Sequence, residues 1–343
     1  MSSGLRGSER PLVELHDLAL VDLDGVVYKG HEPVPYAAES LTSARDGGLE
    51  LQFVTNNASR EPEAVAEQLT SLGVATRPDE VFTAAQAGAA LLTTRLGAGA
   101  RVLVVGGAGL HAAVRSAGYV VVDSAADGPD AVIQGFAPTL GWTDPAEAAY
   151  AVAGGAWFVA TNLDLSLPTD RGYAPGNGAL VGAVQAATGV RPDSAGKPEP
   201  TMYRLAVGRT GARAPLVVGD RLDTDLAGAR AAGYPGLHVL TGVSSARDAV
   251  LARPGERPDY LGADLRALGQ VHPLPVRSGG WWECRDAAAR VVGDVLEVRG
   301  DGVDAARAAC AAAWDAVDRG GVVDPDTVPT LGVGSAREAA SDR

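Results

Sequence analysis

The stretch LVDLDGVVYKG, residues 20–30, decides how the rest of the sequence is interpreted. An apolar run ends in two aspartates one residue apart, Asp22 and Asp24, and Gly25 follows at once. A continuous apolar run is typical of a buried strand in a parallel sheet. Charge is costly to bury. The two carboxylates at the end of this strand therefore predict a site where a ligand compensates that cost.

The composition is that of a globular protein with more than one domain. The chain has 343 residues, of which 46% are hydrophobic and 21% charged,. Its formal net charge of −13 argues against a nucleic-acid partner, which would require a basic face,. With no signal-peptide pattern and no long apolar span, we expect a cytoplasmic protein without a membrane partner. Cys284 and Cys310 lack metal-site spacing, so any metal is expected to have oxygen ligands,.

Two sets of apolar runs predict an α/β fold with parallel sheets. The runs at 18–22, 51–57, 216–220 and 237–242 are all short and continuously apolar,. One helix is expected at 36–48, between the first two runs, and another at 59–73, after the second run, with Ser59 as its N-cap,. Further runs at 101–106, 119–123, 131–135 and 157–161 predict a second α/β unit. The sequence thus predicts one α/β module inserted into another, with right-handed crossovers.

The expected domain boundaries follow from this pattern. Residues 12–83 and 191–272 are predicted to form the first domain, with the second inserted at 84–190. After the Pro-rich stretch 272–280, residues 279–330 predict a small α+β C-terminal extension, and 331–343 a disordered tail,. The extension, with Trp281, Trp282 and Trp314, is a candidate for docking or for homodimer formation.

Polar residues follow three of the first-domain strands. Asp22 and Asp24 end the first run, Thr55, Asn56 and Asn57 the second, and Asp220 a third. The carboxyl ends of parallel strands lie along one sheet edge, where ligands bind. Converging carboxylates need a cation, and Mg²⁺ prefers oxygen ligands. These clusters therefore predict a magnesium site with Asp22 and Asp220 as ligands and the backbone carbonyl of Asp24 as a third.

Lys197 is one of only two lysines, against 27 arginines. It lies just before a helix in the segment GKPEP. An ammonium group beside a phosphorylated carboxylate would neutralise charge in the ground and transition states. Thr55 and the loop amides after it are expected to hold the other phosphate oxygens.

The segments DLDGVVYKG, VTNN, GKP and GDRLDTD, in this order, resemble the four motifs of the haloacid dehalogenase (HAD) superfamily. Their form is similar to the NagD-like, p-nitrophenylphosphatase branch, which carries a large α/β cap of the C2 type between the second and third motifs. The resemblance covers roughly residues 15–270. It implies a Rossmann-like HAD core with a parallel sheet, an inserted C2-type cap at 84–190, and an uncharacterised extension.

The resemblance implies a phosphatase that works through a phosphoaspartate. Asp22 would be the nucleophile, and Asp24 the general acid that protonates the leaving group and then the base that activates water. A halide leaving group needs no proton, so the second aspartate favours phosphatase or phosphomutase chemistry over dehalogenase chemistry. The large inserted cap favours a phosphatase.

The resemblance also implies how phosphate and metal are held. Thr55 and Lys197 would bind the transferring phosphoryl group, with Asn56 and Asn57 nearby. Mg²⁺ would be bound by Asp22, Asp24 and Asp220, and Asp225 would support these ligands from behind.

The substrate is expected to be a small phosphorylated metabolite, because a large cap excludes bulky phosphoproteins. Asn162, Asp164 and Arg171 in the insert are candidate substrate-binding residues. Members of the branch act on glycerol 3-phosphate, 2-phosphoglycolate, pyridoxal phosphate or nucleoside monophosphates. Because the candidate segment is polar and has no aromatic cluster, glycerol 3-phosphate is the preferred expectation.

Two other functions remain open on the sequence. The glycine-rich segment VVGGAGL, residues 104–110, follows a predicted strand and could indicate a dinucleotide site, with Asp123 after the next strand. Its G-G-x-G spacing departs from the dinucleotide fingerprint. A non-catalytic binding module is the other alternative, although every catalytic residue of the four motifs is present.

Overall fold

The structure is a computed structural model that describes residues 4–169 and 171–332. The chain divides into two compact units. The first comprises residues up to 51 together with those from 211 onward, and the second comprises residues 52–210.

The first unit contains a parallel sheet that confirms the expected α/β class. Its strands, in spatial order, are β15 (Tyr260–Gly262), β14 (Gly236–Val239), β13 (Pro215–Gly219) and β1 (Leu18–Val21). Every residue of these strands is buried, as the continuous apolar runs predicted,. Because the strands are parallel, their carboxyl ends lie along the same edge of the sheet.

Short helices and one hairpin surround these strands. The helices are α1 (Leu12–Leu15), α2 (Ala37–Asp46), the π-helix η3 (Leu222–Leu226), α9 (Ala227–Ala232), α10 (Ala246–Val250) and the 3₁₀-helix η4 (Leu265–Gly269). The hairpin pairs β2 (Tyr28–Lys29) with β3 (Glu32–Pro33). It comes directly after the two aspartates of the opening stretch.

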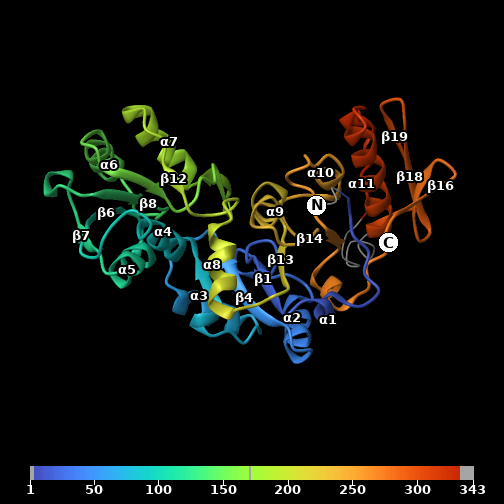
Figure 1. Cartoon of the computed structure of the whole chain (residues 1–343), viewed down its shortest axis with the longest axis horizontal. Coiled ribbons are helices and arrows are strands. Elements are labelled where there is room, and N and C mark those ends of the chain that lie inside the picture. Colours follow the sequence, from blue (N-terminus) through green and yellow to red (C-terminus); the bar gives the residue numbers. More distant parts are fainter. Residues whose placement is uncertain (1–3, 170, 333–343) are drawn as a thin grey trace. The chain divides into compact units, whose positions relative to one another are not determined.

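The C-terminal extension is a four-stranded antiparallel sheet covered by one long helix. Its strands are β16 (Val276–Ser278), β17 (Trp281–Cys284), β18 (Ala287–Val292) and β19 (Val295–Arg299), followed by α11 (Gly302–Asp318) and the 3₁₀-helix η5 (Pro325–Thr327). Figure 1 shows α11 in red alongside the orange strands. The predicted α+β extension is therefore present, and its first strand lies within the Pro-rich stretch expected to be a linker.

The extension packs against the rest of the first unit through buried polar contacts. The side chain of Arg307, 5% exposed, donates two hydrogen bonds of 2.6 and 3.1 Å to the carbonyl oxygen of Leu261 in β15. The indole of Trp314 donates to the carbonyl oxygen of Ala249 in α10, at 3.1 Å. These bonds join α11 to the parallel sheet and its helix, so the extension is part of this unit's core.

The two cysteines of the chain lie in this extension. Cys284 and Cys310 are both free and buried. Burial raises the pKa of the Cys284 thiol to about 12 and also raises the pKa of Cys310, so both remain protonated,.

His272 gives the first unit a pH-dependent stability. Burial lowers its pKa to about 4, and its ring lies 3.0 Å from the carbonyl oxygen of Ala267 and 3.4 Å from Arg307. Unfolding restores a pKa near 6.5, so the unfolded chain binds more protons than the native chain between these values, and stability falls as the pH falls through this window. The full difference is on the order of 3 kcal/mol. The variant His272→Gln, which keeps a donor and an acceptor, should reduce the pH dependence of urea unfolding between pH 6.5 and 4. A remainder is expected from His238, whose pKa burial also lowers to about 4. An unchanged slope would contradict the role of His272.

The second unit begins with a pair of parallel strands and continues into the insert. β4 (Glu50–Thr55) crosses the unit boundary and pairs with β5 (Val81–Thr83). A five-stranded parallel sheet follows in the order β12 (Asp193–Ser194), β9 (Trp157–Ala160), β8 (Ala131–Gln134), β6 (Arg101–Val105) and β7 (Val120–Val122). The predicted second α/β module is thus present, with four of its five strands at the expected positions; the short strand β12 was not expected and lies beyond the predicted insert.

Helices cover both faces of this five-stranded sheet. In Figure 1, α6 (Thr143–Ala153) and α7 (Asn177–Thr188) lie on one face, and α4 (Ala84–Leu92) and α5 (Ala108–Ser116) lie on the other. The unit also contains α3 (Pro62–Ser71), α8 (Thr201–Thr210), the 3₁₀-helices η1 (Pro78–Glu80) and η2 (Ala125–Asp127), and a hairpin of β10 (Ser166–Thr169) and β11 (Gly172–Pro175).

Of the tail predicted at 331–343, residues 333–343 lie outside the described residues. Within residues 4–169 and 171–332, no helix combines the length and apolar character needed to cross a membrane.

Candidate active site

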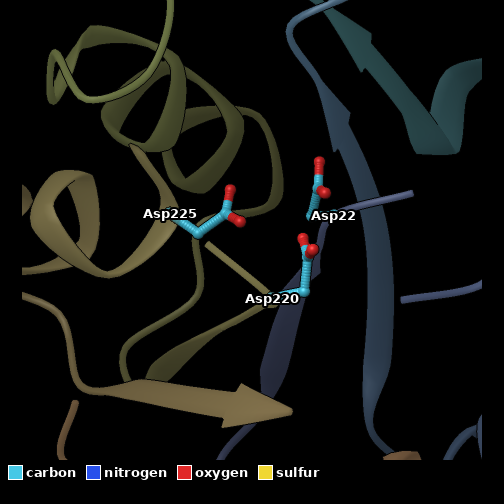
Figure 2. A group of neighbouring side chains, drawn as sticks. All are labelled: Asp22, Asp220 and Asp225. Carbon is cyan, nitrogen blue, oxygen red and sulfur yellow. The ribbon is translucent and has the colours of Figure 1, made fainter. Parts of the chain in front are cut away.

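Three aspartates from two segments of the first unit meet at the carboxyl edge of its parallel sheet. Asp22 follows β1, Asp220 follows β13, and these strands are direct neighbours, with Val21 opposite Val218. Asp225 lies in the π-helix η3. One carboxylate oxygen from each residue lies within 4.8 Å of the others, and all three residues are buried (Figure 2). We call Asp22, Asp220 and Asp225 the carboxylate group.

Two glycines let the chain approach Asp220 closely. A Cβ atom at Gly242 would lie 1.8 Å from Asp220 Oδ2, and one at Gly25 would lie 2.4 Å from the same oxygen. Gly25 also has a φ of +81°, which disfavours a side chain there,. The amide of Val243 donates a 2.6 Å hydrogen bond to this oxygen. The glycine after the two aspartates is therefore required by the position of a third.

Asp225, expected to support the metal ligands from behind, has a carboxylate oxygen within 4.8 Å of those of Asp22 and Asp220. Its Oδ2 accepts a 3.1 Å hydrogen bond from the amide of Arg221, and its Cβ and carboxylate fill the space that a side chain at Gly219 would need. A π-helix inserts an extra residue into a turn and is frequent at functional sites. Here η3 brings the last aspartate of GDRLDTD back beside the first.

Asp24 has a different environment from Asp22. It is exposed, and among the described residues it is not a member of the carboxylate group. It forms an isolated bridge with Tyr28, and the amide of Gly25 donates to the carbonyl oxygen of Tyr28 at 2.7 Å. The two aspartates of the opening stretch therefore differ in their access to solvent.

The carboxylate group fits a hard divalent cation. Three buried carboxylates within 4.8 Å repel one another unless a positive charge neutralises them,. All the donor atoms are carboxylate oxygens, which Mg²⁺ and Ca²⁺ prefer over softer metals. Together with the fold, this group defines an α/β protein with a divalent-cation site at the carboxyl end of its strands.

The second unit gathers the other predicted site residues around the end of β4. Lys197 is 4% exposed, and its ammonium donates a 3.3 Å hydrogen bond to the carbonyl oxygen of Val54. The hydroxyl of Thr55 accepts a 3.1 Å hydrogen bond from the amide of Asn57. The side chain of Asn56 bonds to the backbone of Lys197. The VTNN and GKP segments therefore meet in one place.

The side chain of Asn57 stabilises the turn before α3, and the predicted N-cap of that helix, Ser59, is wrong. Asn57 Oδ1 accepts hydrogen bonds from the amides of Ser59 and Arg60, at 2.9 and 3.2 Å, and from the Ser59 hydroxyl. The N-cap of α3 is Glu61 rather than Ser59, because the asparagine turn holds Ser59 outside the helix,.

The candidate substrate residues of the insert fall into two kinds. Asn162 donates a 2.8 Å hydrogen bond to the carbonyl oxygen of Asn56, and Asp164 accepts one of 3.0 Å from the Asn56 side chain. Arg171 is exposed between β10 and β11. The side chains of Asn162 and Asp164 are thus engaged within the protein.

The glycine-rich segment 104–110 has a structural explanation that disfavours a dinucleotide site. A Cβ atom at Gly109 would lie 2.4 Å from the carbonyl oxygen of Arg60, and one at Gly107 would lie 2.9 Å from that of Ser59. The amide of Gly109, in the first turn of α5, donates to the Ser59 carbonyl at 3.1 Å. The chain itself occupies the helix start where a pyrophosphate would bind. Asp123, after the next strand, is exposed.

Known families match both parts of the first unit and much of the second. A profile described as haloacid dehalogenase-like hydrolase matches residues 19–120, and one described as HAD-hydrolase-like matches residues 194–268. The D-glycerol 3-phosphate phosphatase of Mycobacterium tuberculosis is 48% identical over 318 residues, which cover 90% of this chain and 88% of that protein.

Two solved structures resemble this chain throughout their length. The crystal structure of a glycerol phosphate phosphatase from M. tuberculosis in complex with magnesium has a TM-score of 0.83 and 46% identity, over 90% of this chain and 93% of that one. The 4-nitrophenylphosphatase of Thermotoga maritima has a TM-score of 0.70 and 28% identity, over 75% of this chain and 98% of that one. About a quarter of this chain thus has no counterpart in the second.

The chain belongs to the haloacid dehalogenase-like hydrolases, in their NagD-like, p-nitrophenylphosphatase branch, and is a phosphoric monoester hydrolase.

Proposed function

We propose that this enzyme hydrolyses glycerol 3-phosphate to glycerol and phosphate, with Mg²⁺ as cofactor and a phosphoaspartate as intermediate. The observation that carries the chemistry is the buried carboxylate group of Asp22, Asp220 and Asp225, within 4.8 Å of one another. The identity of 48% to a D-glycerol 3-phosphate phosphatase over nine tenths of the chain supports the choice of substrate.

The proposed reaction has two displacements on phosphorus. A carboxylate oxygen of Asp22 attacks phosphorus, the bond from phosphorus to the leaving alkoxide breaks, and Asp24 gives its proton to that alkoxide. Asp24, now ionised, takes a proton from water, which attacks phosphorus and breaks its bond to Asp22. Phosphate leaves and both aspartates return to their starting states. Splitting one difficult displacement into two is the general advantage of covalent catalysis.

The remaining residues are proposed to hold Mg²⁺ and the phosphate oxygens, so that the negative charge of the site is neutralised. When bound, Mg²⁺ supplies positive charge that offsets the phosphate and the carboxylates. Asp22, Asp220 and Asp225 have the donor atoms to hold it, and the backbone carbonyl of Asp24 stays a proposed ligand. Lys197 and Thr55 are proposed to hold phosphate oxygens, because phosphoryl transfer depends mainly on positioning and on charge neutralisation.

A phosphate-release screen tests the substrate and the metal together. The purified chain should release phosphate from glycerol 3-phosphate without any added nucleotide, and EDTA should abolish this activity until Mg²⁺ is restored in excess. The comparison esters are 2-phosphoglycolate, pyridoxal phosphate and a nucleoside monophosphate. A kcat/KM for any of them well above that for glycerol 3-phosphate would reject the proposed substrate, and activity that survives EDTA would reject the metal.

A further inference from the structure

Asn56 occupies the centre of a hydrogen-bond network that joins three distant segments. Its Oδ1 accepts a 2.9 Å hydrogen bond from the amide of Lys197, and its Nδ2 donates to the carbonyl oxygen of the same residue at 3.2 Å. The carboxamide therefore holds both polar groups of the Lys197 backbone. The two contacts span 141 residues of sequence.

The same carboxamide also holds the insert. The second Nδ2 hydrogen is directed to Asp164 Oδ2 at 3.0 Å. The backbone carbonyl oxygen of Asn56, which is not part of the carboxamide, accepts a 2.8 Å hydrogen bond from Asn162 Nδ2. An asparagine amide has two donor hydrogens, so both are used within the protein. The segment after β9 and the lysine segment thus share one side chain.

Glycines make this junction tight. A Cβ atom at Gly196 would lie 2.8 Å from Asn56 Oδ1 and 2.3 Å from the carbonyl oxygen of Thr161, at the end of β9. A Cβ atom at Gly178 would lie 2.2 Å from the carbonyl oxygen of Leu163. With the backbones this close, a displacement of residues 162–164 must be accompanied by movement at Lys197 or by loss of the Asn56 bonds.

We propose that Asn56 is a positioning residue that couples the segment 162–164 of the insert to Lys197, and that it acts through these hydrogen bonds rather than by binding substrate. It fixes the Lys197 backbone, from which the ammonium reaches the Val54 carbonyl beside Thr55. Asn162 and Asp164 were expected to bind substrate. In this proposal they instead provide the contacts of the insert to Asn56. The catalytic part of the inference rests on the proposed phosphatase function.

Hydrogen–deuterium exchange tests the junction without reference to activity. In Asn56→Ala, peptides covering residues 160–165 and 195–199 should exchange about fivefold faster than in the wild type, since each loses a hydrogen bond to Asn56. Asn57→Ala is the matched control, because the Asn57 side chain bonds to Ser59 and Arg60 and should affect only their peptide. Unchanged exchange at 195–199 in Asn56→Ala would overturn the inference.

Kinetics test the consequence for catalysis. Asn56→Ala should lower kcat about 10- to 100-fold with a smaller effect on KM, because a misplaced Lys197 affects the phosphoryl group of any ester. The loss should be the same for glycerol 3-phosphate and p-nitrophenyl phosphate. Asn56→Asp, which keeps the shape but replaces the donor with a carboxylate beside Asp164, should behave like the alanine variant if the latter does not fold.

A double mutant separates positioning from substrate binding. If Asp164 acts through Asn56, then Asn56→Ala combined with Asp164→Ala should be no slower than Asn56→Ala alone, whereas Asp164→Asn, which keeps an acceptor, should retain most activity. Losses that multiply, or a rise in KM for glycerol 3-phosphate alone, would overturn the inference and return both residues to substrate binding. A wild-type chain that releases no phosphate from any ester would reject the proposed function, while the exchange result would still decide the junction.

Discussion

Replacing Asp22 with asparagine is expected to abolish turnover of every phosphate ester. The amide has the same shape, but it lacks the negative charge and the nucleophilic oxygen that the proposed first displacement requires. Asp22 is also one of the three carboxylates within 4.8 Å. The loss should therefore exceed the effect of removing any residue that only helps to position the substrate.

The control for this variant is a measurement of its thermal unfolding, which shows whether it still folds. Asp22 is 9% exposed and follows a strand whose residues are all buried, and asparagine fills the same volume. Asp22→Asn should unfold at a temperature close to that of the wild type in EDTA. A variant that retains near wild-type turnover would refute the covalent scheme.

Asp24→Asn is expected to separate the two displacements. With glycerol 3-phosphate the variant should lose about 10²- to 10⁴-fold in kcat, because neither the leaving alkoxide nor the attacking water has its proton-transfer partner. With p-nitrophenyl phosphate, the leaving nitrophenolate needs no proton. Stopped-flow absorbance should then show a rapid burst of one nitrophenolate per enzyme, followed by slow turnover.

The burst distinguishes a loss of proton transfer in Asp24→Asn from a change in the structure of the site. Asp24 is exposed and stands apart from the carboxylate group among the described residues, so its substitution should leave the metal ligands in place. Equal slowing of both esters, with no burst, would mean that Asp24 acts through the site's structure rather than through proton transfer.

Much of the parallel-sheet architecture could be predicted because it depends on local pattern. Buried parallel strands are continuous apolar runs, and the runs at 18–22, 216–220 and 237–242 became β1, β13 and β14,. Because parallel strands end at one edge of a sheet, the pattern also predicts that Asp22 and Asp220 lie near each other. Their meeting in the structure supports that reasoning.

The rest depends on contacts between residues that are distant in sequence. The bonds from Asn56 to Asp164 and Lys197 span 108 and 141 residues, and no local pattern indicates that one asparagine holds both. The π-helix that brings Asp225 beside Asp220 is a local irregularity that apolar periodicity does not reveal. The strand β18 begins with three alanines in place of the β-branched residues that mark most strands, and it packs against α11,.

Trapping the covalent intermediate shows directly whether Asp22 is the nucleophile. The enzyme is mixed with glycerol 3-phosphate and Mg²⁺, quenched in acid during turnover, and reduced with borohydride, which converts an acyl phosphate of aspartate to homoserine. Peptide mass spectrometry should find homoserine at position 22 in the wild type and in no sample without substrate. Turnover with an unmodified Asp22, or with the label on another residue, would contradict the account.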